Sequence, residues 1–128
     1  MGNIMKKRIN PSLECKPINI ITIRNMMEQR NKLVNEAYIK EFNRIINILI
    51  KNINTMIVMV ANKGKNNAYI ILSDPIYRFI IPDTLYDVDV EIKYNKKIIE
   101  TIKKLYNKYE ISYYDSFINL QYIKINWD

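Results

Sequence analysis

The chain has 128 residues, 48% of them hydrophobic, and a formal net charge of +7 at neutral pH. This length fits one domain with its own core, and the hydrophobic content argues against an intrinsically disordered chain. With no histidine, one cysteine and two glycines, the sequence excludes histidine-based catalysis, an intramolecular disulfide and a glycine-rich phosphate loop. We therefore expect a protein that is not an enzyme and that needs no cofactor.

Charge is distributed unevenly along the sequence. Residues 1–65 carry twelve Lys/Arg and four Asp/Glu, a net charge of +8, whereas residues 66–128 carry eight and nine, a net charge of −1. A molecule with this charge asymmetry can bind an anionic partner at its basic end, or it can stack on copies of itself through oppositely charged ends. A solvated surface explains the same pattern, and the sequence leaves these alternatives open.

Residues 1–21 are predicted to form a flexible basic arm. Lys6, Lys7 and Arg8 form a short basic run within it, and two prolines interrupt any regular helix. Such arms are often ordered only by a partner. One interpretation is that the arm clamps a neighbouring subunit.

A long helix is predicted to begin at Thr22, because neither proline nor glycine interrupts residues 22–53. Its apolar residues recur every three, four or seven positions, while the opposite face, which includes Glu41, is predicted to be polar. The helix is longer than a small domain needs, so we expect it either to break or to project. The predicted apolar stripe consists of Met27, Val34, Tyr38, Phe42, Ile45, Leu49 and Ile53.

Strands are predicted after this helix. The apolar run 56–61 and the segment 68–73 flank a polar turn that contains Gly64, a pattern typical of a β-hairpin. Residues 77–81 lie between two prolines and predict either an edge strand or a loop.

A second helix is predicted at about residues 96–109, with Asn95 as its N-cap. Just before it, Val88, Val90 and Ile92 alternate with acidic residues. This alternation predicts a half-buried strand, or an extended segment that leads into the helix.

The C-terminal part is predicted to be a second hairpin, with residues 111–114 extended and residues 117–127 as the final strand. The apolar positions change face between Tyr122 and Ile123, which predicts either a β-bulge or burial of both faces. The element order predicts an α+β fold, a two-layer sandwich of one long N-terminal helix and a second helix packed on a small antiparallel sheet. Residues 22–128 are expected to form this single domain.

Candidate chemical groups are sparse. Asp87, Asp89 and Glu91 share one face of the predicted strand and are the best candidates for a magnesium site or for acid/base catalysis. The strand alternation already explains them as its solvent side. Cys15 has no histidine that could activate it as a nucleophile. We therefore predict no catalytic, cofactor-binding or metal-binding residues.

Half of the aromatic residues lie in the last 23 positions. Tyrosine and tryptophan are favoured at protein interfaces, although these rings could equally complete the core of the domain. The candidate interface residues are Lys6, Lys7, Arg8, Ile18, Ile20, Tyr106, Tyr109, Tyr113, Tyr114, Phe117, Tyr122 and Trp127.

Nucleic-acid binding is the alternative. The chain has a pI near 9.4, and its candidate phosphate contacts are Lys6, Lys7, Arg8, Lys63 and Lys65. Tyrosines can stack on bases. No recognised nucleic-acid-binding signature appears in the sequence.

The order of segments resembles that of short proteins of tailed bacteriophages. The segments that carry this resemblance are the long helix, the turn at 61–64 with the strand 68–72, the helix end at 104–112, and the closing run Tyr-Ile-Lys-Ile-Asn-Trp at 122–127. The chain departs from the pattern before the last helix-to-strand crossing, where Asn107 or Lys108 stands in place of the usual glycine. The resemblance implies a non-catalytic virion component, on the capsid or neck, and assigns no functional residues.

We therefore expect a structural or assembly component of a virus particle that binds capsid, neck or tail subunits through its arm, its long helix and its aromatic C-terminal region. Its partners would be proteins, namely its own copies or larger virion proteins, and it would reside in the virion and, during assembly, in the host cytoplasm. No membrane partner is expected, because no run of 18 apolar residues occurs. The alternative is a small basic regulator that binds nucleic acid.

Overall fold

The computed structural model describes residues 15–116 and 120–128. The chain divides into two compact units, residues 1–31 and residues 32–128, and helix α2 contains residues of both. The elements in chain order are α2 (Ile20–Ala61), β1 (Asn67–Ile71), the short 3-10 helices η1 (Pro75–Tyr77) and η2 (Asp83–Leu85), α3 (Val88–Leu105), β2 (Glu110–Asp115) and β3 (Gln121–Asn126). The predicted α+β class is confirmed.

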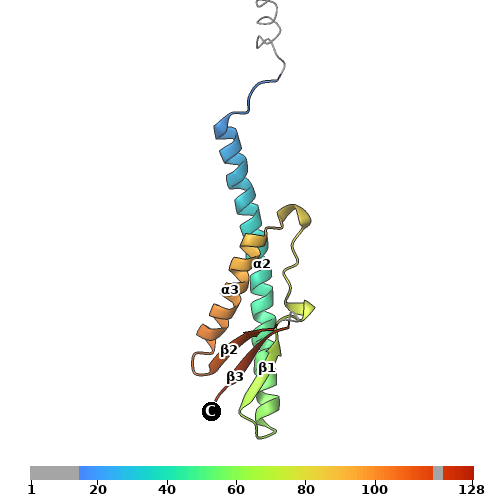
Figure 1. Ribbon diagram of the computed structural model, residues 1–128, viewed down its shortest axis with the longest axis vertical. Helices are drawn as coiled ribbons and strands as arrows, with labels where there is room; N and C mark the ends of the chain where they lie inside the picture. Colours follow the sequence, from blue (N-terminus) through green and yellow to red (C-terminus); the bar gives the residue numbers. More distant parts are fainter. Residues whose placement is uncertain (1–14, 117–119) are drawn as a thin grey trace, which may run out of the picture. The chain divides into compact units, whose positions relative to one another are not determined.

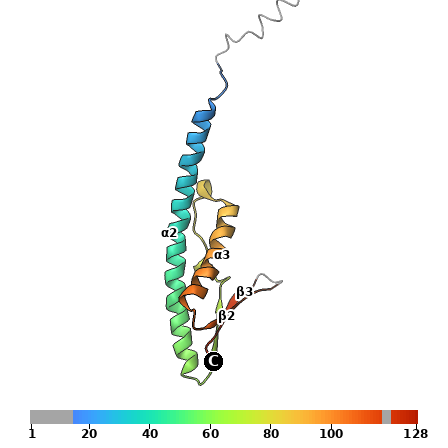
Figure 2. The same cartoon turned by 90° about the vertical axis from the view of Figure 1, so that its left-hand side faces the viewer.

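Within residues 32–128, α2 and α3 run side by side and pack on the antiparallel sheet (Figures 1 and 2). The strand order is β1-β3-β2, so the last strand of the chain is the central one. The core between the helices and the sheet is aliphatic, which matches the expected two-layer arrangement. Its buried members are Ile45, Ile46, Leu49, Ile53, Ile70, Ile98, Ile102, Tyr106, Ile123 and Ile125.

Helix α2 is one uninterrupted helix of 42 residues. It begins two residues earlier than predicted, where the side-chain oxygen of Asn19 accepts a hydrogen bond of 2.8 Å from the N–H of Ile21. Such a bond satisfies one of the free amides of a first helical turn. The predicted apolar stripe is buried or half-buried from Val34 to Ile53, whereas Met27 is 59% exposed.

The predicted hairpin between residues 56–61 and 68–73 is wrong. Residues 56–61 form the last turns of α2, which ends before Gly64, whose φ of +76° suits glycine. Strand β1 pairs instead with β3. A short apolar run is compatible with a buried strand or a buried helix, and here the helix continues because no proline or glycine lies between Pro17 and Gly64.

Both alternatives predicted for residues 88–92, a half-buried strand and an extended segment that leads into the helix, are wrong, because α3 begins at Val88, well before the predicted cap Asn95. Asp87 is the N-cap, and its carboxylate accepts hydrogen bonds from the N–H groups of Asp89 (3.0 Å) and Val90 (3.3 Å). The acidic residues in this first turn also interact favourably with the helix dipole. The alternation of acidic and apolar residues is therefore an N-terminal helix signal.

The predicted C-terminal extended segment 111–114 is confirmed as part of β2, and the final strand is β3. Residues 117–119 lie outside the described residues. The pairing of β3 with both neighbours has a continuous register, so the predicted bulge is absent from Gln121–Asn126. Ile123 and Ile125 are buried, whereas Tyr122 lies on the opposite face of the sheet.

The connection from β1 to α3 is a loop, so of the two alternatives for residues 77–81 the loop is correct. Tyr38, a fully buried residue of α2, holds the end of this loop. Its hydroxyl donates to the carbonyl of Asp87 and accepts from the N–H of Asp87, each at 3.1 Å. The Tyr38 ring stacks on Tyr94 at 5.9 Å and contacts Phe79 at 5.5 Å.

A buried carboxylate anchors the same loop nearer its centre. Glu41, predicted on the polar face of the helix, is only 9% exposed. It accepts hydrogen bonds from the N–H of Ile80 (2.8 Å) and from the guanidinium of Arg44 (3.0 Å). Arg44 in turn donates to the carbonyls of Ile76 (3.1 Å) and Arg78 (2.6 Å). The periodicity missed this role because a loop, and not solvent, covers Glu41.

Replacing Tyr38 with phenylalanine is expected to lower the free energy of unfolding by about 1 to 2 kcal/mol, because both backbone groups of Asp87 lose their hydroxyl partner. Chemical denaturation measures the effect. Tyr86→Phe is the control, since Tyr86 is 49% exposed and the hydrogen bond of its hydroxyl to Glu91 is open to solvent, and it should change the stability by less than about 0.5 kcal/mol. Equal effects of the two substitutions would contradict the anchoring role of Tyr38.

Candidate interaction site

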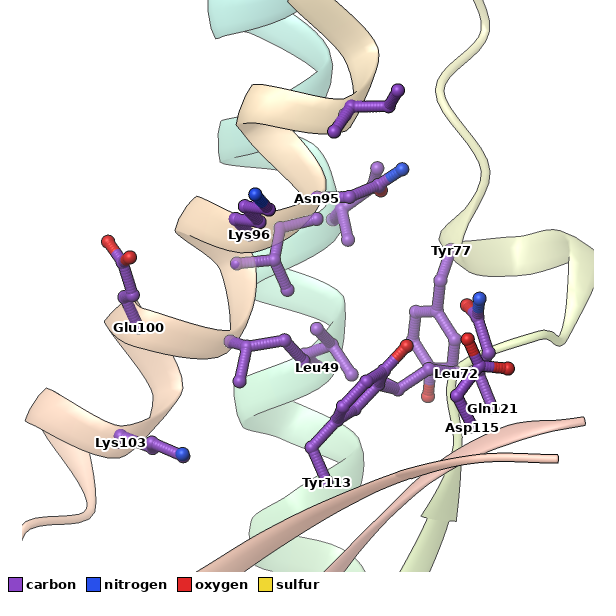
Figure 3. Close-up of a pocket in the computed structure, with 14 residues that line it drawn as sticks. Leu49, Leu72, Tyr77, Asn95, Lys96, Glu100, Lys103, Tyr113, Asp115 and Gln121 are labelled. Carbon is purple, nitrogen blue, oxygen red and sulfur yellow. The ribbon is translucent and has the colours of Figure 1, made fainter.

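A cavity of about 610 Å³ lies between α2, α3 and the ends of β2 and β3. Its floor is apolar and includes Leu49 and Ile98. Figure 3 shows Lys96 and Lys103 of α3 on one side of the cavity, and Asp115 of β2 on the other. An apolar floor with charges at its rim suits the binding of an amphipathic group.

One polar group that lines this cavity is the hydroxyl of Tyr113. Burial raises the pKa of the Tyr113 hydroxyl, and the negative charge of Asp115 adds to this effect. The Tyr113 hydroxyl therefore stays protonated at neutral pH and can donate a hydrogen bond.

The predicted acidic cluster is explained by helix capping. Asp87 caps α3, and Asp89 lies in the first turn beside it. Glu91 accepts a hydrogen bond of 3.1 Å from the hydroxyl of Tyr86, and this bond raises the pKa of Tyr86. Cys15 is exposed. In the described part of the chain, no group of three or more His, Cys, Asp or Glu side chains could hold a metal ion.

Three of the predicted interface residues contribute to the packing of the domain. Tyr106 is 8% exposed, and its hydroxyl donates a hydrogen bond of 2.6 Å to the side chain of Asn54. Tyr109 packs edge-on against Tyr106 at 5.6 Å, and Trp127 is partly buried against the core. Phe117 lies outside the described residues. For these aromatic residues, completion of the core is therefore the better interpretation.

Other aromatic residues lie on the face of the sheet opposite the helices. The rings of Tyr114 and Tyr122 stack at 4.9 Å, and those of Tyr69 and Tyr122 are 6.0 Å apart. Tyr69 and Tyr114 are 50% and 42% exposed. We call Tyr69, Tyr114 and Tyr122 the tyrosine face. Sequence reasoning missed Tyr69 because the wrong hairpin gave its strand the wrong neighbour.

The first turns of α2 expose apolar side chains. Ile20, Ile23 and Met27 follow the spacing i, i+3, i+7, which places them on one helical face. They are 64%, 40% and 59% exposed, and Ile18 just before them is 69% exposed. We call Ile20, Ile23 and Met27 the N-terminal stripe.

The predicted phosphate contacts fall into two groups. Lys6, Lys7 and Arg8 lie outside the described residues. Lys63 and Lys65 are exposed on the turn between α2 and β1. The structure therefore places two of the five candidates at one end of the sheet.

Helix α2 is also, among the described residues, the one helix long and apolar enough to cross a membrane, with a mean hydropathy of 1.4 over 18 residues. Length and composition alone are weak evidence, since core helices pass the same test. In this helix Ile45, Leu49 and Ile53 pack in the core. Asn47 and Lys51 would be costly inside a bilayer. In the structure 22% of this window is buried, and the part of α2 that faces α3 and the sheet lies in the core.

No protein-family model, curated protein or solved structure matches this chain. Its class is therefore defined by its own fold, an α+β domain with exposed apolar and aromatic surfaces. The resemblance to tailed-phage proteins stays a prediction.

Proposed function

We propose that this protein is a non-catalytic assembly component of a virus particle and that it binds a neighbouring protein subunit through the N-terminal stripe. The observation that carries this proposal is the exposure of Ile20, Ile23 and Met27 on one helical face. Burying an aliphatic side chain of this size on binding contributes about 1.5 to 3 kcal/mol. Three such anchors are a substantial part of the free energy of a protein complex.

The spacing of the stripe favours a groove on the partner. Anchors at i, i+3 and i+7 are typical of an amphipathic helix that lies in an apolar groove. A self-sufficient coiled coil needs about three or four heptads, more than the stripe supplies. Residues 15–32 contain four basic residues and one acidic residue. We therefore expect the groove to have an acidic rim.

The choice of a virus particle rests on the resemblance to tailed-phage proteins. The fold and the exposed stripe support a docking role in any large assembly. The phage resemblance selects the virion among such assemblies, and the capsid, neck and tail subunits are the candidate partners.

Replacing Ile20, Ile23 and Met27 together with glutamate is expected to reduce the number of copies per particle at least about tenfold, because apolar anchors are lost and charges enter the groove. Quantitative mass spectrometry of purified particles measures the copies. Circular dichroism checks that the variant stays folded.

The matched control replaces Thr22, Asn25 and Gln29 with glutamate. These exposed residues have the same i, i+3, i+7 spacing on the opposite side of the helix, and the change in charge is identical. The control should be incorporated normally. The proposal is wrong if the wild-type protein is absent from purified particles, or if both triple variants lose incorporation equally.

A further inference from the structure

We propose that the tyrosine face is a binding site for single-stranded nucleic acid, with bases stacked on Tyr69 and Tyr114 and a phosphate bound by Lys124. This site lies on the sheet, and the proposal does not depend on the docking role of the N-terminal stripe. Exposed aromatic side chains beside a cation are the elements that bind single strands without sequence preference.

The geometry of the face suits consecutive bases. Tyr122 on the central strand has Tyr114 on one side and Tyr69 on the other, at 4.9 Å and 6.0 Å. Its two neighbours keep 42% and 50% of their surface in solvent. The two outer rings therefore remain available for stacking, while Tyr122 holds them in place.

The cation lies within the same face. Lys124 is on the central strand, in register with Tyr69, and its ammonium group lies 5.9 Å from the centre of the Tyr69 ring. An apolar protein partner would have to desolvate this charge in the middle of the interface, which is costly without a counter-ion. A phosphate group supplies the counter-ion.

The composition of the face also favours nucleic acid over a second protein layer. Among the paired strand positions that the structure describes, this face holds one aliphatic residue, Ile71, besides the tyrosine face and Lys124. The buried core of a protein interface is instead depleted in charge and rich in apolar area. The remaining positions carry side chains that can form hydrogen bonds. They are Asn67, Glu110, Ser112 and Asn126.

Basic residues outnumber acidic ones around one end of the sheet. Lys63 and Lys65 are exposed on the turn before β1, and Lys108 is exposed just before β2. Glu110 and Asp128 are the acidic residues at this end. The local excess of positive charge, within a chain of net charge +7, attracts the phosphates of a strand that extends beyond the tyrosine face.

The test measures the binding of the full chain to fluorescein-labelled oligothymidine and oligouridine of about 12 nucleotides. Fluorescence anisotropy gives the dissociation constant, which we expect in the micromolar range at about 50 mM salt. The double variant Tyr69→Leu/Tyr114→Leu keeps the apolar bulk and the charge but removes the rings. It should weaken binding by about 5- to 100-fold.

Two matched controls separate stacking from charge. Tyr86→Leu removes a tyrosine that is equally exposed, 49%, outside the sheet, and should leave the affinity unchanged. Lys124→Gln should weaken binding and reduce the slope of log affinity against log salt concentration by about 0.7, whereas Lys51→Gln, at an exposed position of α2, should not weaken binding comparably.

The outcomes that overturn the proposal are distinct. One is the absence of binding by the folded wild-type chain, and another is unchanged affinity in the double tyrosine variant, which would assign all binding to charge. Equal affinity for a DNA duplex contradicts stacking, because paired bases are not available to tyrosine. A dimer that the tyrosine substitutions dissociate would assign this face to a protein partner.

Discussion

Replacing Ile125 with alanine is expected to lower the free energy of unfolding by about 3 to 4 kcal/mol, the largest effect of any single substitution considered for this protein. Ile125 is fully buried on the central strand, where its register partners are Ala68 of β1 and Ile111 of β2. Removing its outer carbons leaves a cavity that neighbours on both sides can fill only in part. Denaturation by urea, followed by far-ultraviolet circular dichroism, measures the loss.

The matched control is Ile71→Ala, the same chemical change at a strand position that is 52% exposed. It should cost less than about 1 kcal/mol, since little apolar surface is lost from the core. The comparison also bears on function, because β3 carries Tyr122 and Lys124 as well as Ile125. Similar losses for the two variants would contradict the placement of β3 at the centre of the sheet.

Replacing Glu41 with glutamine is expected to lower the free energy of unfolding at neutral pH by about 1.5 to 3 kcal/mol, the range for a lost hydrogen bond to a charged group. Desolvation by burial raises the pKa of Glu41. The hydrogen bonds from Arg44 and from the Ile80 N–H, with the positive charges of Arg44 and Lys40, outweigh this effect, so the pKa lies below its ordinary value of 4.5.

The sign of the pH dependence follows from this depressed pKa. Folding favours the ionised carboxylate, so the stabilisation is present above the ordinary value of 4.5 and is lost as the pH falls through the lower pKa of the folded protein. The wild type should therefore lose stability relative to Glu41→Gln as the pH falls below that value. Unfolding curves between neutral and acid pH measure the difference.

Glu36→Gln is the control for this substitution, because Glu36 is an exposed carboxylate on the same helix. It should change the free energy of unfolding at neutral pH by less than about 0.5 kcal/mol. Hydrogen exchange provides a second measurement, since the amide of Ile80 should lose protection in Glu41→Gln. A pH dependence that is the same in the wild type and Glu41→Gln would show that Glu41 does not anchor the loop.

Helical periodicity was reliable where one face of a helix meets the core. Ile45, Leu49 and Ile53 were predicted as a stripe and are all fully buried, because the sheet and α3 cover that face. The same pattern failed at Glu41, which the loop covers, and at Met27, which is exposed. Periodicity identifies a face, but it does not show what covers that face.

The capping residues of α3 indicate where this helix begins more accurately than the apolar periodicity does. Asp87 followed by Asp89 and Glu91 is a helix N-terminus, yet the alternation of apolar residues was read as a strand. The polar turn with Gly64 was recognised, but as a hairpin turn, whereas it follows the C-terminal end of α2. Local signals thus indicated a turn at Gly64 and a boundary near Asp87, but they did not identify the type of element on either side.

The amino-acid sequence by itself determined the α+β class, the apolar stripe of α2 and the extended C-terminal segments, because periodicity and turn residues act over a few neighbouring positions. Only the tertiary structure decided that β1 pairs with β3, that Glu41 holds a loop, and that Tyr69 joins Tyr114 and Tyr122 on one surface. These features join residues far apart in the chain. Which distant segments meet depends on the packing of the whole core, and local preferences do not encode that choice.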